Sequence, residues 1–145
     1  MKILIKQAKI IAPSSPFNGQ IKDIFIEDGK IVKIDTTISV KSDKIIDEEE
    51  MCISVGWMDI FADFSDPGFE QKEDMVSGTK AAAAGGFTDI MLIPNTNPAV
   101  DNKTQVEYIV QKAKQSAVNI HPVGAISKNA TGKELAEMYD MRQSG

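Results

Sequence analysis

The chain has 145 residues, of which 42% are hydrophobic and 26% are charged, a composition typical of a globular protein with its own core. Its net charge of −5 argues against nucleic-acid binding, because no basic stripe is present that could neutralise phosphates. A single cysteine excludes an internal disulfide, and no apolar run resembles a signal peptide or a membrane span, so we expect a cytoplasmic protein without membrane contact.

The first third of the chain predicts a small β module. Short apolar strands are expected at residues 3–5, 9–11, 21–27, 30–34 and 44–46. Asp28-Gly29 separates two of these strands and is a strong hairpin sequence. We therefore assign residues 1–53 to a first domain made of strands.

From residue 54 onward the pattern changes to alternating strands and helices. Strands are expected at residues 57–64, 87–93 and 118–126, and helices at residues 71–84 and 102–117. Gly85-Gly86 should end the first helix, and Asn102 can cap the start of the second. This alternation predicts an α/β domain over residues 54–145, with a parallel sheet and helices packed outside it.

The end of the sequence predicts a third helix. Thr131 and Glu134 have the spacing of a capping box, and Leu135, Met138 and Tyr139 would lie on one side of the following helix. The third strand would then be an open edge, so we expect the domain to be truncated and the chain to self-associate. A closed eight-stranded α/β barrel needs about 250 residues, so at most its first three β/α units fit here.

The most informative segment is residues 58–68, which has the character of a metal-binding strand whose ligands have been replaced. A strand projects residues i and i+2 to one face, so a His-x-His pair there would direct two imidazoles at one metal. Phe61 and Asp63 hold those two positions. The chain contains one histidine, His121, so a multi-histidine site cannot be built from these residues alone.

Seven segments together resemble the N-terminal part of a dihydroorotase, a cyclic-amide hydrolase of the amidohydrolase superfamily. Allantoinases and hydantoinases share some of them, but the Pro-Asn-Thr-Asn-Pro loop is most similar to the dihydroorotase branch. The segments are residues 56–60, 66–68, 70–74, 78–88, 94–98, 123–126 and 134–138. The resemblance implies a TIM-like (β/α)8 amidohydrolase barrel beside a composite β-sandwich, of which residues 1–53 would be half.

The resemblance also implies which residues would form the site. Family members bind one or two zinc ions through a His-x-His pair after the first strand and through later ligands. The two histidines would fall at Phe61 and Asp63, and the arginine that holds the substrate carboxylate at Ser65. Asn95 matches a second substrate-binding residue of the family and is a possible remnant, although hydrogen bonds within its own turn are the favoured explanation.

The chemistry of these replacements argues against a metal site. A phenyl ring has no lone pair for zinc, and Asp63 offers one carboxylate where three protein ligands are usual. The hydroxyl of Ser65 cannot clamp a carboxylate as a guanidinium does. We therefore expect no catalytic residue, no metal ligand and no bound cofactor in this chain, whereas the family uses zinc.

Structural roles are also expected for His121, for Cys52 and for the pair Asp63 and Asp66. His121 should be a packed or surface histidine rather than a substitute ligand. Asp63 and Asp66 could be imagined as a carboxylate pair for acid–base chemistry, but without histidine or metal nearby a structural role is favoured. Cys52 has no basic neighbour and is expected to be an inert, buried thiol.

Three functional hypotheses follow. In the first, the protein is a dihydroorotase-like member of pyrimidine biosynthesis that is catalytically inactive and acts as a structural partner. The resemblance suggests aspartate transcarbamoylase as that partner, since noncatalytic dihydroorotase-like chains in some bacteria assemble with it. In the second, an active cyclic amidohydrolase completes a rearranged zinc site with residues beyond 145. In the third, the chain is a self-sufficient binding module, an interpretation that its open third strand disfavours.

Overall fold

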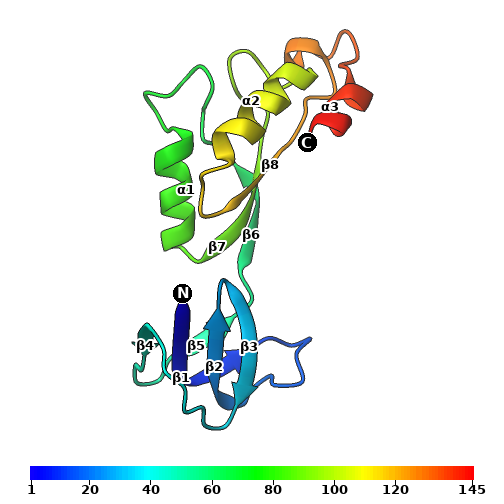
Figure 1. Ribbon diagram of the computed structural model, residues 1–145. Coiled ribbons are helices and arrows are strands. Elements are labelled where there is room, and N and C mark those ends of the chain that lie inside the picture. Colours follow the sequence, from blue (N-terminus) through cyan, green and yellow to red (C-terminus); the bar gives the residue numbers. More distant parts are fainter. The chain divides into compact units, whose positions relative to one another are not determined.

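The computed structural model describes residues 1–145 and shows two compact units, Met1–Val55 and Gly56–Gly145. The sequence prediction placed the change of domain between residues 53 and 54. The first unit consists of strands and the second alternates strands with helices, so the fold is α/β (Figure 1). None of the helices combines the length and the apolar composition needed to cross a membrane.

The first unit is a five-stranded sheet built around its longest strand. The central strand β1 pairs antiparallel with β2 and parallel with β4 and β5, and β2 pairs antiparallel with β3. Asp28 and Gly29 both have positive φ, 48° and 77°, as the predicted hairpin turn between β2 and β3 requires. The strands are β1 Lys2–Ile11, β2 Ile21–Glu27, β3 Lys30–Asp35, β4 Lys44–Ile46 and β5 Cys52–Ser54.

A bulge explains why the first two predicted strands are one. The β1–β2 register shifts between Ile5 and Ala8, where Gln7 has a φ of 49°. Asp23, 2% exposed, accepts hydrogen bonds from the backbone N–H groups of Gln7 (3.0 Å) and Ile38 (2.9 Å). The bond from Gln7 satisfies a donor that the bulge removes from the ladder, so β1 continues through it.

The prediction of a buried Cys52 was wrong, because this residue is exposed.

The second unit is a three-stranded parallel sheet in the order β6-β7-β8, with helices between successive strands. Its core lies between the sheet and these helices and includes Ile90 and Leu92 from β7 and Val106 and Ile109 from α2. The elements are β6 Trp57–Ala62, α1 Met75–Ala84, β7 Phe87–Leu92, α2 Lys103–Ala113, β8 Asn119–Pro122, the short 3-10 helix η1 Lys128–Ala130, and α3 Met138–Ser144.

Local capping groups set the ends of the first two helices. Asp74 caps α1 by accepting a hydrogen bond from the backbone N–H of Ser77 (2.7 Å), so this helix starts later than the predicted residue 71. Asn102 caps α2 as predicted, accepting from the N–H groups of Thr104 and Gln105. Gly86, with a φ of 84°, supplies the predicted left-handed residue after α1.

The predicted start of the third helix was wrong. The Thr131 hydroxyl donates to the carbonyl of Lys128 (3.0 Å) instead of capping a helix. The backbone at Leu135 pairs with Ser127 in an antiparallel bridge. It is therefore extended at a position where the predicted helix would already have begun. Helix α3 therefore starts only at Met138.

Candidate functional site

Three side chains that the sequence analysis singled out meet beyond the carboxyl ends of β6 and β7. Because these strands are parallel, the loops that follow them leave the same edge of the sheet. Asp63 accepts hydrogen bonds through Oδ1 from the backbone N–H (2.8 Å) and the hydroxyl (3.2 Å) of Ser65. Its Oδ2 accepts one from the side-chain amide of Asn95 (2.8 Å). The site is thus a carboxylate held by three donors.

These contacts favour the ionised form of the carboxylate. Partial burial would raise the pKa of Asp63, but the hydrogen bonds from Asn95 and Ser65 outweigh it, and the charge of Lys72 acts in the same direction. The pKa of Asp63 therefore lies below its ordinary value. The ionised carboxylate is the form that accepts all three hydrogen bonds, so the lowered pKa of Asp63 is consistent with the geometry of these bonds.

Phe61 does not join this group. Its side chain is among the most exposed large apolar ones, with 75% of the residue accessible, and its backbone N–H donates to Oδ1 of Asp59 (2.9 Å). Of the two positions where the resemblance implies zinc ligands, one thus holds a ring without a lone pair, and the other holds a carboxylate already engaged in three hydrogen bonds. The residues present do not fit a zinc site.

The other candidate ligands are also used elsewhere. His121 is on β8 and exposed, and its Nε2 lies 2.9 Å from Oδ1 of Asp89. Asp89 accepts further hydrogen bonds from Thr88 and Asn119, and the pKa of Asp89 is lowered, chiefly by the bond from His121. No group of three or more histidine, cysteine, aspartate or glutamate side chains has an arrangement that could hold a metal ion.

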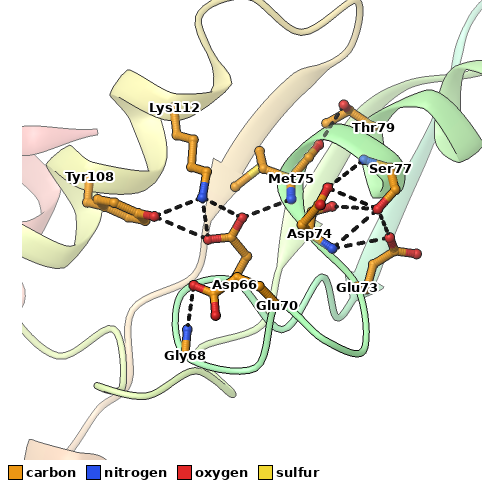
Figure 2. A network of polar contacts seen from close by, with 10 residues as sticks. All are labelled: Asp66, Gly68, Glu70, Glu73, Asp74, Met75, Ser77, Thr79, Tyr108 and Lys112. Atoms are coloured by element: carbon orange, nitrogen blue, oxygen red, sulfur yellow. Dashed lines mark hydrogen bonds and ion pairs between the residues drawn. The ribbon is translucent and has the colours of Figure 1, made fainter.

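Sequence reasoning missed a second polar network, centred on Asp66 (Figure 2). Asp66 is 1% exposed, and its carboxylate lies 2.8 Å from Nζ of Lys112 through each oxygen. It also accepts the first backbone N–H of α1, from Met75 (2.9 Å), and the hydroxyl of Tyr108 (3.3 Å). One buried carboxylate thus links the loop after β6 to α1 and α2, the structural role that the sequence analysis favoured.

The Lys112 ammonium is held in its charged form by this network. Burial would lower the pKa of Lys112, but hydrogen bonds to Asp66 and to the Tyr108 hydroxyl outweigh it and raise the pKa well above the ordinary value. Tyr108 and Lys112 are four residues apart on α2, so they share one helix face. That spacing is visible in the sequence, but nothing in it identifies Asp66 as the partner.

Comparison with known proteins places these residues in a family context. A family model described as dihydro-orotase-like matches residues 51–145. The dihydroorotase of Aquifex aeolicus is 42% identical over 146 aligned positions, covering 100% of this chain and 34% of the relative. The dihydroorotase of Acetivibrio thermocellus is 44% identical and covers 99% of this chain and 34% of the relative. The chain thus spans about a third of the length of these curated relatives.

Solved structures show the same fold. A D-hydantoinase crystal structure superposes with a TM-score of 0.71 and 28% identity, over 88% of this chain and 28% of that chain. The L-hydantoinase from Arthrobacter aurescens gives a TM-score of 0.77 at 20% identity, over 99% of this chain and 31% of that chain. At the latter identity the likeness concerns the fold alone.

Proposed function

Because the chain belongs to the dihydro-orotase-like family, we propose that it forms the N-terminal part of a pyrimidine-biosynthesis protein that keeps the family's fold without hydrolysing dihydroorotate. In this proposal residues 54–145 are the first three β/α units of a (β/α)8 barrel. Residues 1–53 are half of a composite β-sandwich. The cytoplasmic location expected from the sequence belongs to the same proposal.

The observation that carries the proposal is the pair of residues at the expected metal-binding positions of β6 and the loop after it. Phe61 supplies no lone pair, and both oxygens of Asp63 are already hydrogen-bonded to Ser65 and Asn95. A hydrolase of this kind needs the metal to lower the pKa of its attacking water well below that of bulk water. Without these ligands that activation is lost.

The substrate anchors support the same conclusion. Ser65 replaces the expected arginine, and 8% of the residue is exposed, so its short side chain cannot reach out to clamp a ligand carboxylate. Asn95 is present, but its amide is bonded to Asp63 (2.8 Å). Both groups that would hold the substrate are thus absent or already engaged.

A protein with this fold and no metal site is suited to a structural role in an assembly. We propose aspartate transcarbamoylase as the partner, by analogy with noncatalytic members of the family. Co-expression of the full-length protein with the transcarbamoylase of the same organism tests the proposal. A stable complex on size-exclusion chromatography supports it, and two separate peaks at micromolar concentrations contradict it.

The competing function is an active, zinc-dependent cyclic amidohydrolase with ligands contributed by residues beyond 145. Asp63 is the only residue among the replaced positions that could bind zinc, through an oxygen. Elemental analysis of the full-length protein, together with a dihydroorotate turnover assay, separates the two functions. We expect substoichiometric zinc and no turnover. Stoichiometric zinc with turnover would establish the active enzyme instead.

A further inference from the structure

A cleft of about 440 Å³ lies beside helix α1, between this helix and the end of α2 with the turn that follows it. The residues at the expected metal-binding and substrate-binding positions do not border it, so it is a separate feature of the second unit. Val76, Lys80 and Ala83 line the cleft from one face of α1, and Lys112, Gln115 and Ala117 line it from the opposite side.

Further units added to the sheet would not fill this cleft. Helix α1 connects β6 to β7 and helix α2 connects β7 to β8, and Met75 of α1 and Ile109 of α2 belong to the same core cluster. The outer strands of the sheet are β6 and β8, so the strands of a longer barrel would join at their free edges. The cleft lies between α1 and α2, inward of both edges, and stays open on the helical side of the sheet.

The charge of the cleft is opposite to that of the chain. Two lysines line it and no carboxylate does, although the net charge of the protein is −5. Lys80 is exposed and takes part in none of the six ion pairs. Lys112 contributes less, because its ammonium group is directed at the carboxylate of Asp66 (Figure 2). The unpaired ammonium of Lys80 therefore favours an anionic partner.

The rest of the lining offers accessible apolar surface. Val76 is 57% exposed, and Ala83 and Ala117 are also exposed. Val76 and Lys80 are about 6 Å apart along the helix axis, close to the distance of about 6.6 Å between alternate residues of an extended chain. A small free ligand is usually enclosed over most of its surface, whereas this cleft is half open to solvent. Its shape and spacing suit an extended protein segment.

We propose that this cleft is a docking surface for a short acidic segment of a partner protein. In the docked segment an apolar side chain packs on Val76, and a carboxylate two residues away pairs with Lys80. The ion pair directs the encounter, and the apolar contact excludes water beside it. The inference concerns the chemistry of the surface and not the identity of the partner, so it is tested separately from the proposed function.

The experiment uses the full-length protein with a synthetic peptide as the probe. The capped peptide Glu-Gly-Leu-Gly-Glu is coupled to lysines by a carbodiimide, which joins a carboxylate to an amine with loss of water, and the coupled lysines are quantified by mass spectrometry. The peptide Glu-Gly-Gly-Gly-Glu has the same charge without the apolar side chain. Docking should increase coupling at Lys80 severalfold for the leucine peptide over the glycine peptide. Coupling at Lys103, an exposed lysine at the start of α2, should be the same for both peptides.

Charge reversal at single lysines sharpens the result. The fluorescence anisotropy of the labelled leucine peptide gives its Kd for each variant. Lys80→Glu should weaken binding about fivefold, and raising the salt concentration from about 50 to about 500 mM should weaken binding to the wild-type protein severalfold. Lys103→Glu is the matched control and should change the Kd by less than about twofold.

Three outcomes would overturn the proposal. Equal enrichment at Lys80 and Lys103, or none at either, would show that the peptide does not dock in the cleft. Equal Kd values for the two charge-reversal variants would show only a general attraction between the peptide and lysines. A complete block of coupling at Lys80 by acetate at the peptide's concentration would identify a site for small free anions instead of a protein segment.

Discussion

The carboxylate of Asp66 and the ammonium group of Lys112 form a bifurcated ion pair, 2.8 Å through each oxygen, although 46 residues separate them in the sequence. Asp66 is completely buried as a side chain, while Lys112 keeps 34% of its side chain exposed. The pair connects the loop beyond β6 to α2, and the bond from Met75 to Asp66 adds the start of α1. It therefore supports the edge of the sheet on which the Asp63 site lies.

Replacing Lys112 with methionine should destabilise the second unit. The change leaves the buried Asp66 carboxylate with only the Met75 N–H and the Tyr108 hydroxyl. Breaking a buried pair costs about 3–5 kcal/mol, and partial exposure of the lysine lowers our expectation to about 2 kcal/mol. Urea unfolding measures the loss. Lys80→Met removes an exposed α1 lysine without a recorded ion pair and should stay within about 0.5 kcal/mol of wild type.

The same pair predicts a pH dependence at the alkaline end. The pKa of Lys112 is raised in the folded protein, so its contribution is fully present below the unfolded value of about 10.4. It is lost as the pH rises from there through the folded-state pKa. The difference in unfolding free energy between wild type and Lys112→Met should be constant from neutral pH to about pH 10 and shrink above it. A difference that grows with pH would show the sign to be wrong.

Gly78 should not tolerate alanine, although it lies inside helix α1. A Cβ built there would sit 2.6 Å from Cδ1 of Phe64, a ring in the core of the second unit. The gain in helix propensity is about 1 kcal/mol, whereas overpacking costs about 1–3 kcal/mol, so we expect a net loss of up to about 2 kcal/mol. Gly85→Ala is the matched control, because its φ of −79° suits alanine and its nearest contact is 3.3 Å. Equal effects of both substitutions on chemical unfolding would argue against the clash.

Local sequence features account for what could be predicted of the fold. The Asn102 cap and the Gly86 terminator act within a few residues, so their sequences specify helix ends without knowledge of the rest. The apparent capping box at Thr131 and Glu134 was misleading, since the surrounding loop supplied a competing partner, the carbonyl of Lys128. Only tertiary structure decides between such local alternatives.

The candidate site was predicted in its positions but not in its contacts. The resemblance identified Asp63, Ser65 and Asn95, and parallel strands place the ends of β6 and β7 at one sheet edge. That Asp63 would bond to the other two depends on the left-handed φ of Ser65 and on the path of the loop after β7. Neither this backbone conformation nor the path of that loop can be read from a short sequence motif.

The 145-residue chain by itself should self-associate in solution. Strand β6 pairs only with β7, and apolar side chains on it are exposed, among them Ile60 at 69% and Phe61 at 75%. An unpaired edge with exposed apolar residues is a template for pairing with a second copy. Light scattering should give an apparent mass that rises with protein concentration.

A charge on this edge should weaken the association, because burying a lysine between strands is costly. Ile60→Lys should lower the apparent mass toward that of the monomer. Val76→Lys is the matched control: Val76 is 57% exposed but lies on helix α1, so this variant should associate like the parent chain. A monomer mass for the parent chain that does not depend on concentration would exclude the edge as an association surface. Equal effects of the two substitutions would show that overall charge, and not the edge, controls association.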